Sequence, residues 1–572
     1  MKKRVFLFLM TVAIVTTSLA GCGKNLSGGS TSSDTTEAEA DYYDTESAFT
    51  AEAPAEAEAA AEEYEYDYDY SESKAVEEGS YLESCYDYVD VLPMDGEEYS
   101  QWDEKGYASV LKEPLSTFSA DVDTASYSNL RRMIQYGYGL EDIPQGAVRI
   151  EEMLNYFTYD YQDPEGKEPF GVTTRIGACP WNEEAELLMI GLKTEDIDYE
   201  NAPPSNLVFL LDVSGSMYSD DKLPLLQEAF CMLADNLSDK DRVSIVTYAG
   251  EDTVVLSGVK GNQSRKIKAA IKDLEAGGGT NGSKGIETAY SLAEENFIKG
   301  GNNRIILATD GDLNIGLTSQ EELEELITEK KESGIFLSVL GFGTGNIKDN
   351  KMETLADKGN GNYAYIDSNR EAKKVLVEEM SATLLTICKD VKFQVEFNPA
   401  VVSGYRLIGY ENRVLNKEDF NDDKKDAGEI GAGHSVTALY EIILKEPLPA
   451  LSEDEIENLK YSDNYKKEME QDKDNPAFSQ EWLTISIRYK KPAEEESNLL
   501  QYPISFDSYS RTPSDDFRFA AAVAEFGLLA SHSDYAEDAS VSHVKKVLKE
   551  IELNDEYKEE FLELVEKIAQ WE

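Results

Sequence analysis

The sequence has 572 residues, 41% of them hydrophobic, so it is long enough for several domains with apolar cores. Its 112 acidic residues against 54 basic ones give a formal net charge of −58. Such a chain repels nucleic acid and anionic lipid headgroups, so no nucleic acid partner is expected. The acidic excess favours solubility, and the alternative is that it attracts cations or basic partners.

The first 21 residues are typical of an export signal. Three basic residues at positions 2–4 precede the apolar stretch Val5–Leu19, which is too short for a stable membrane span. Leu19-Ala20-Gly21-Cys22 resembles the lipobox of bacterial lipoproteins, in which the cysteine is acylated, for example with palmitate, and becomes the mature N-terminus. We therefore expect the protein on the extracytoplasmic face of a cell membrane, held only through a lipid anchor at Cys22. A plain secretory signal is the alternative.

Residues 22–101 have the composition of an acidic disordered spacer. No Lys or Arg occurs between Lys24 and Lys74, and tyrosine recurs among acidic residues, as in EEYEYDYDYSES. Self-repelling segments with little apolar surface to bury stay unfolded, so this segment would hold the folded part away from the membrane. The alternative for the tyrosines is contact with wall polymer or a partner.

Residues 102–204 predict an N-terminal extension of helices and strands. The stretch TASYSNLRRMIQYG is typical of a helix with Asp123 or Thr124 as its N-cap, and Ala147–Phe157 is a second amphipathic helical segment. PFGVTTRIGACPW and AELLMIGLKT alternate between apolar and polar residues, which predicts an antiparallel pair of half-buried strands.

From residue 205 to residue 387 strand and helix patterns alternate. This alternation predicts an α/β fold, a doubly wound and mostly parallel sheet with helices on both faces. The strand candidates are Leu207–Leu211, Arg242–Tyr248, Thr253–Leu256, Arg304–Ala308, Phe336–Gly341 and Asn362–Ile366. The helix candidates are Leu223–Leu237, Ser264–Leu274, Ser283–Phe297, Gln320–Lys331, Lys351–Lys358 and Arg370–Leu385.

Oxygen-bearing side chains gather at three points of this segment. The apolar run VFLL leads directly into Asp212, Ser214 and Ser216. Thr280 lies in the glycine-rich stretch GGGTNGSKG, and Asp310 follows the apolar strand candidate RIILAT. Ligands of open α/β sheets bind at the carboxyl ends of the strands, where these residues are expected. Carboxylates and hydroxyls are hard donors, which suit Mg²⁺, Mn²⁺ or Ca²⁺ better than zinc.

The five residues match, position by position, the metal-ion-dependent adhesion site of von Willebrand factor type A domains, so the segment resembles that family. The resemblance implies one divalent cation, most often Mg²⁺, with Mn²⁺ or Ca²⁺ as alternatives. It also implies that Ser214, Ser216 and Thr280 bind the ion directly in the ligand-bound state, while Asp212 and Asp310 often act through water. An open position on the ion then suits a carboxylate from an acidic residue of a protein partner.

Residues 388–510 predict a β-rich C-terminal extension, and residues 511–572 predict C-terminal helices. The stretch NDDKKDAGEIGAG within the extension is expected to be a mobile charged loop, with ion binding by its acids as the alternative. The strands on either side of the α/β segment are too few to form a full sandwich alone. We therefore expect the two sets to pair with each other, with the α/β domain inserted between them.

The chain after about Trp102 resembles bacterial exported lipoproteins with a von Willebrand factor type A domain between two family-specific extensions. The resemblance is carried on the N-terminal side by STFSADVDTASYSNLRR and VRIEEMLNYF. On the C-terminal side it is carried by YRLIGYENR, DAGEIGAGH, VTALYEI and DFRFAAAVAEFG. The resemblance to this family implies the architecture and a metal site. It implies the physiological role less firmly.

The residue patterns favour a protein-binding module over an enzyme. The three histidines have no metal-ligand spacing, and no Gly-Lys pair is followed by Ser or Thr as a phosphate-binding loop requires. We therefore expect a surface-anchored adhesion or recruitment module that depends on a divalent cation. A structural envelope scaffold, whose metal only stabilises loops, is the first alternative, and a metal-dependent hydrolase is the second.

Replacing the lipobox cysteine tests the expected anchor. The Cys22→Ala protein should not take up labelled palmitate, because the acylated thiol is gone, whereas the wild type should take it up and partition into detergent. A wild-type mature protein that carries no lipid and is released to the medium would contradict the anchor.

Overall fold

The computed structural model of the protein describes residues 96–120, 123–197, 202–279, 282–311, 320–379, 384–445, 481–492 and 494–571. The expected export signal, Cys22, Thr280 and most of the expected spacer lie outside these residues. The end of that spacer is already part of the fold, because Glu97 forms an ion pair with Arg132 at 2.9 Å and is 1% exposed. Residues 96–101 therefore belong to the described fold and not to the expected spacer.

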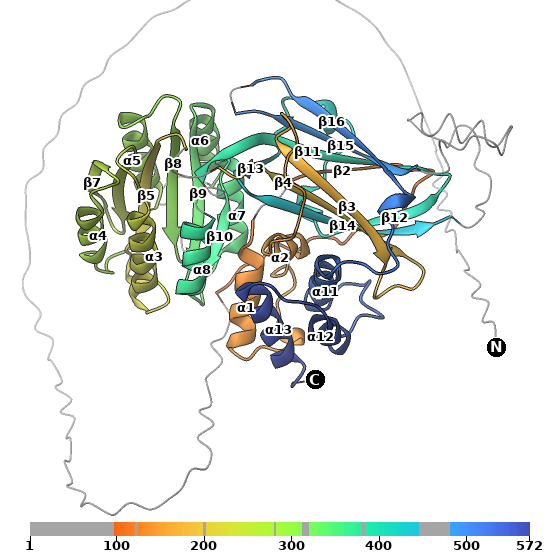
Figure 1. The fold of residues 1–572 in the computed structure, drawn as a ribbon. Coiled ribbons are helices and arrows are strands. Elements are labelled where there is room, and N and C mark those ends of the chain that lie inside the picture. The colour runs from red at the N-terminus through yellow and green to blue at the C-terminus, as the bar shows by residue number, and fades with distance from the viewer. Residues whose placement is uncertain are drawn as a thin grey trace, which may run out of the picture. The chain divides into compact units, whose positions relative to one another are not determined.

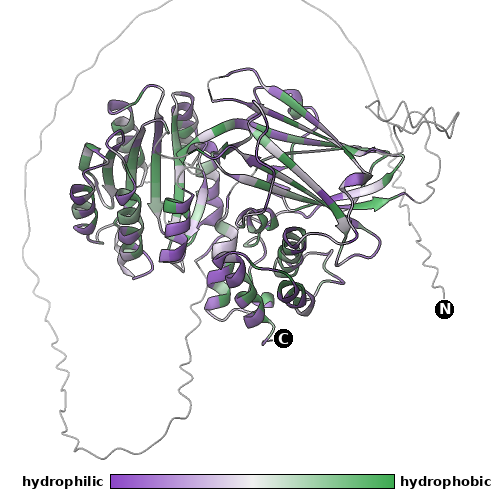
Figure 2. Ribbon diagram, in the orientation of Figure 1, coloured by the Kyte–Doolittle hydropathy of each residue, from purple (hydrophilic) through white to green (hydrophobic). Residues whose placement is uncertain are grey.

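The middle of the chain forms a sheet of six strands, counted in the described residues, in the order β10-β9-β8-β5-β6-β7 (Figure 1). Neighbouring strands pair in parallel except β6 and β7. Continuous apolar runs suit the centre of such a sheet, where both faces are covered, and these strands are coloured as hydrophobic in Figure 2. The bounds are β5 Ser205–Asp212, β6 Arg242–Tyr248, β7 Asp252–Lys260, β8 Asn302–Thr309, β9 Ile335–Phe342 and β10 Tyr363–Ile366.

Helices cover both faces of this sheet, as the alternating pattern predicts. One apolar core joins strand residues such as Phe209 to Phe230 and Ile267, and a second joins Val208 on the other face to Ala289 and Met352. The helices are α3 Leu223–Asp235, α4 Ser264–Lys272, α5 Gly282–Glu295, α6 Gln320–Glu332, α7 Asp349–Lys358 and α8 Asn369–Lys373.

The helix expected over Arg370–Leu385 is described in part. The α8 helix passes into a π-helical turn at Lys374–Glu378, and strand β11 already begins at Thr386. Residues 380–383 lie outside the described residues; Leu384 after them is helical, and both Leu384 and Leu385 are buried.

The strands on either side of the α/β domain pair with each other, which confirms the expected insertion. In one sheet β4 before the domain pairs with β14 after it, and in the other β2 pairs with β11. The first sheet has the order β1-β12-β14-β4-β3, and the second has β13-β11-β15-β16 with β2 beside β11. The bounds are β1 Ala108–Ser109, β2 Leu115–Ser119, β3 Phe170–Ala178, β4 Glu186–Thr194, β11 Thr386–Phe397, β12 Val402–Ile408, β13 Gly428–Gly431, β14 Ser435–Leu444, β15 Glu481–Lys490 and β16 Asn498–Ser505.

The two sheets face each other across one apolar core. Phe118 of β2 stacks on Phe393 of β11 with ring centroids 4.9 Å apart, and Phe118 also approaches Tyr440 of the opposite sheet at 6.3 Å. The expected loop NDDKKDAGEIGAG is wrong in its second half, because Gly428–Gly431 forms β13. Ile430 is fully buried there, and the strand pairs with β11.

Helices from both ends of the chain pack together beside the sandwich (Figure 1). Their shared core includes Tyr127, Met153, Phe519 and Phe561. The second N-terminal helix covers six residues, fewer than Ala147–Phe157 suggested. The bounds are α1 Ala125–Gln135, α2 Ile150–Asn155, α11 Asp515–Ala530, α12 Val541–Glu550 and α13 Glu556–Ile568. Within the described ranges, no helix has the length and apolar character needed to cross a membrane.

Thr124 occupies the N-cap position of α1, but no side-chain cap bond is formed there. Asp123, the other expected cap, accepts a hydrogen bond from the backbone N–H of Tyr363 at 2.7 Å. Tyr363 begins strand β10, so this carboxylate joins the N-terminal extension to the inserted sheet.

Buried ion pairs also join the inserted domain to its flanks. Arg131 of α1 contacts Asp367, directly after β10, at 2.5 Å and Glu371 of α8 at 2.7 Å. Arg149, at the start of α2, contacts Asp349 of α7 at 2.6 Å. All these groups are at most 5% exposed, so removing one partner leaves an uncompensated charge in a medium that solvates it poorly.

Replacing Arg149 tests this connection. The Arg149→Met protein should lose about 3–5 kcal/mol of unfolding free energy, because Asp349 stays buried without its cation. Thermal and urea unfolding would measure the loss. The control is Lys193→Met, whose partner Asp163 is 79% exposed, and it should change stability by less than about 1 kcal/mol. Equal losses in both variants would contradict a structural role for the buried pair.

Candidate metal centre

Two carboxylates lie at the carboxyl ends of neighbouring strands. Asp212 is the last residue of β5, and Asp310 directly follows Thr309, the last residue of β8. The register pairs Leu211 with Ala308, so the two chain ends reach the same edge of the sheet. Asp212 is 0% exposed and Asp310 is 1% exposed. The structure thus places these two acids at one edge of the sheet.

The loop after β5 places its hydroxyls beside Asp212. The backbone N–H of Ser214 donates to Asp212 Oδ1 at 2.9 Å, and the hydroxyl of Thr309 donates to Asp212 Oδ2 at 3.2 Å. The hydroxyl oxygens of Ser214 and Ser216 lie 3.0 Å apart, at the start of a short 3-10 helix over Gly215–Tyr218. The carboxylate is therefore held in one orientation, with two neutral oxygen donors next to it.

The glycine-rich loop is bound against the β5 loop by its backbone. Gly277 donates its N–H to the carbonyl of Val213 at 2.8 Å, and Gly215 donates to the carbonyl of Gly278 at 3.1 Å. Gly278 has a φ of +83°, a left-handed conformation that favours glycine. Thr280 follows two residues later but lies outside the described residues, so its position at the site stays a prediction.

Lys222 is a residue of this edge that the sequence analysis missed. Its Nζ donates to Asp310 Oδ2 at 2.9 Å, and its side chain is 10% exposed. It lies ten positions after Asp212, directly before the first residue of α3. A lone lysine ahead of a helix carries no local signal of burial, since most lysines are exposed. The contact exists only because the folded chain brings α3 and β8 to the same edge.

Burial makes the charged form of Asp212 unfavourable. The pKa of this carboxyl is raised to about 6, mainly by loss of solvent; hydrogen bonds from Ser214 oppose the shift, and the nearby charge of Asp310 adds to it. A neighbouring cation stabilises the ionised form of such a buried carboxyl. The edge is therefore electrostatically suited to a positive ion.

The donor set fits a hard divalent cation. Its carboxylates come from Asp212 and Asp310, and its hydroxyls come from Ser214 and Ser216. Oxygen-only donors of this kind suit Mg²⁺, Mn²⁺ or Ca²⁺. Across the described ranges no group of three or more His, Cys, Asp or Glu side chains could hold a metal. A metal at this edge would therefore depend on the serine hydroxyls as well as the two acids.

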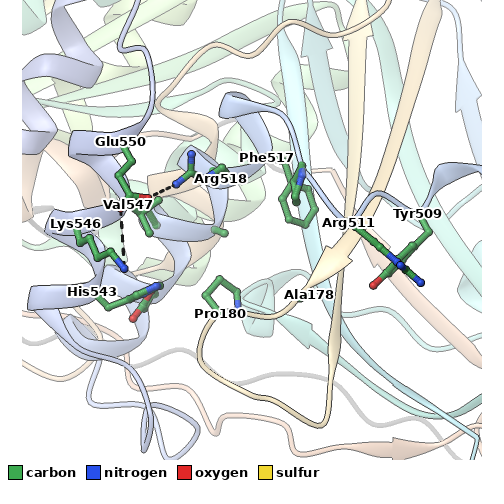
Figure 3. Close-up of a pocket in the computed structure, with 14 residues that line it drawn as sticks. Ala178, Pro180, Tyr509, Arg511, Phe517, Arg518, His543, Lys546, Val547 and Glu550 are labelled. Atoms are coloured by element: carbon green, nitrogen blue, oxygen red, sulfur yellow. Dashed lines mark hydrogen bonds and ion pairs between the residues drawn. The ribbon is translucent and has the colours of Figure 1, made fainter.

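A separate cavity of about 450 Å³ lies between the end of β3, the segment 509–513 and helices α11 and α12 (Figure 3). Its wall is apolar around Pro180, Phe517 and Val547. Glu550 pairs there with Arg518 at 2.8 Å, an ion pair drawn in Figure 3. None of Asp212, Ser214, Ser216 and Asp310 lines this cavity, so the sheet edge remains the candidate functional site.

Comparison with protein families matches three segments of the chain. Residues 206–379 match the model described as von Willebrand factor type A domain, and residues 93–189 match one described as von Willebrand factor. Residues 382–571 match the C-terminal region of Uncharacterized protein YfbK. The inserted α/β domain is therefore a von Willebrand factor type A domain, a type that commonly binds a divalent cation and mediates protein interactions.

Individual proteins resemble the chain over different shares of its length. Uncharacterized protein YfbK of Escherichia coli (strain K12) is 41% identical over 477 residues, covering 82% of this chain and 80% of that protein. Inter-alpha-trypsin inhibitor heavy chain H3 of Homo sapiens is 25% identical over 271 residues, covering 44% of this chain and 30% of that protein. The solved structure of a von Willebrand factor type A protein from Catenulispora acidiphila is 15% identical with a TM-score of 0.40, covering 72% of this chain and 91% of that one.

The raised pKa of Asp212 predicts a pH-dependent stability in the absence of metal. Because the raised pKa favours the neutral carboxyl in the folded state, protonated Asp212 contributes fully to folding stability below the unfolded-state pKa near 3.8. This contribution is lost as the pH rises through about 6. In EDTA, Asp212→Asn should gain up to about 3 kcal/mol relative to the wild type between pH 4 and pH 8. Urea unfolding across this range measures the difference, and the exposed Asp239→Asn serves as control. A flat difference would mean that Asp212 keeps an ordinary pKa.

Proposed function

Because the chain belongs to the YfbK family of von Willebrand factor type A proteins, we propose that it is a cell-envelope module that captures a protein partner through a divalent cation. The proposed cation, most often Mg²⁺, is held by Asp212, Ser214, Ser216, Thr280 and Asp310. The observation that carries the proposal is the pair of buried carboxylates at the ends of β5 and β8, with two serine hydroxyls 3.0 Å apart beside them.

Each residue has a distinct part in this function. Asp212 and Asp310 supply the two negative charges that balance a divalent ion, and Ser214 and Ser216 supply neutral oxygens. The Thr309 hydroxyl and the Ser214 N–H orient Asp212, so its oxygens are positioned before the ion arrives. A bound cation would supply an open electrophilic position that accepts a carboxylate oxygen from the partner.

The surface beside the site is suited to a protein partner. Tyr218, at the end of the 3-10 helix that carries Ser216, is 83% exposed, although most large apolar side chains of the described fold are buried. An exposed aromatic side chain next to a charged anchor point is typical of residues that contribute strongly to protein interfaces. We place the partner over this edge, with its acidic residue at the cation and its neighbouring surface on Tyr218.

The proposed location follows from the N-terminal segment. Acylation at Cys22 would anchor the protein on the extracytoplasmic face of a membrane, and the acidic segment after it would separate the domain from the lipid surface. The partner is then expected in the envelope or outside the cell.

Metal titration tests the ion site directly. Calorimetry with Mg²⁺ or Mn²⁺ should find one ion per chain in the wild type, and Asp212→Ala or Asp310→Ala should weaken binding by about a hundredfold or more, because each removes a charge that balances the ion. Thr280→Ala should spare much of the metal affinity. The exposed Asp239→Ala is the matched control. Equal affinity in all variants would place the ion elsewhere.

Partner capture tests the function itself. Wild-type protein should retain an envelope protein in Mg²⁺ and release it in EDTA, whereas Asp212→Ala should not retain it in either. Tyr218→Ala should weaken capture without changing metal affinity, since its side chain is proposed to contact the partner alone. Capture that survives both EDTA and Asp212→Ala would exclude the metal-dependent mechanism and favour a structural scaffold.

A further inference from the structure

Lys222 extends from the start of helix α3 to the candidate metal site. Its Nζ lies 2.9 Å from Asp310 Oδ2. Its aliphatic stem lies over Gly343, where an added Cβ would come within 2.3 Å of Lys222 Cγ. Gly343 also has a φ of +76°, which favours glycine, so this position leaves room for the lysine stem. The packing directs the ammonium group toward the buried carboxylate.

The ammonium group of Lys222 is unfavourable at this position unless an acidic side chain pairs with it. Lys222 is the N-cap residue of a 13-residue helix, whose amino end carries a partial positive charge. The first turn of α3 contains no acidic residue, and the lysine side chain is largely removed from water. The ion pair with Asp310 offsets both costs, so the lysine and the carboxylate depend on each other in the metal-free protein.

The charges at this edge explain what the lysine does to a metal ion. Asp212 and Asp310 contribute two negative charges and Lys222 one positive charge, which leaves a single net negative charge before any metal binds. A divalent cation reverses the net charge to a single positive one. One unbalanced positive charge is unfavourable at this site, because Asp212 and Asp310 are both buried. A carboxylate from a partner would neutralise that charge.

On the basis of the proposed metal site, we infer that Lys222 is a resident cation that competes with the divalent ion for Asp310 and couples metal binding to an acidic partner. In the metal-free protein it neutralises Asp310. When the metal binds, its charge opposes the ion and lowers the affinity. When an acidic partner follows, the partner's carboxylate compensates the extra charge, so metal and partner each strengthen the binding of the other.

The test compares Mn²⁺ binding to the full mature chain with and without this charge. Lys222→Met keeps the length of the stem over Gly343 but removes the ammonium, so calorimetry should show about tenfold tighter Mn²⁺ binding than in the wild type. Its melting temperature in EDTA should fall, and its rise on adding Mn²⁺ should exceed that of the wild type. Lys222→Gln is the second neutral variant, for use if the methionine protein does not fold.

The matched control is Lys268→Met. Lys268 pairs with Asp235, the last residue of α3, at 2.6 Å, so this variant removes a lysine ion pair at the opposite end of the same helix. Its Mn²⁺ affinity should equal that of the wild type. Unchanged or weaker binding in both neutral variants of Lys222, with binding retained in the wild type, would overturn the competition but leave the proposed function intact. A wild type that binds no divalent ion would overturn both.

A free carboxylate tests the coupling. Replacing chloride by acetate at equal ionic strength should tighten Mn²⁺ binding more in the wild type than in Lys222→Met, because only the wild-type site carries the extra positive charge. An equal gain in the two proteins would contradict the coupling.

Discussion

The parallel pairing of β5 with β8 is the interaction on which the rest of the molecule depends. The register that joins Leu211 to Ala308 carries Asp212 and Asp310 to one edge and buries both. Two carboxylates in this setting are unstable without positive charge nearby. The loop hydrogen bonds to Asp212, the lysine on Asp310 and the hydroxyls beside them are all responses to that constraint.

The N-terminal segment ahead of the flanking sandwich contacts chain beside this edge. Glu97 accepts a hydrogen bond from the backbone N–H of Gly345 at 3.0 Å, and the N–H of Glu98 donates to the carbonyl of Ile347 at 2.8 Å. Gly311, next to Asp310, packs against the same segment, because an added Cβ would lie 2.6 Å from the backbone nitrogen of Lys348. The segment 345–348 thus contacts both Gly311 and the N-terminal residues Glu97 and Glu98, which connects the edge that carries Asp310 to the flanks.

Two arginines give this connection its specificity. Arg131 joins α1 to the region after β10, and Arg149 joins the start of α2 to α7. Buried ion pairs add little net stability compared with apolar contacts, but a wrong docking would leave each arginine unpaired. The inserted domain is therefore held in one arrangement against the helices that pack from both ends of the chain.

The sequence by itself determined the α/β insertion and the order of its strands and helices, because apolar runs and the polar residues that end them are local patterns. The same patterns indicated that Asp212 and Asp310 would follow strands that end at one edge of the sheet. It also predicted that the flanking strands would pair, since neither set could cover a core alone. Only the tertiary structure decided the roles of Lys222, Asp123 and Arg149, because a charged side chain shows nothing in sequence about the distant carboxylate or backbone group that it will meet. The same reason explains β13, whose strand depends on pairing with β11 and not on its own charged and glycine-rich sequence.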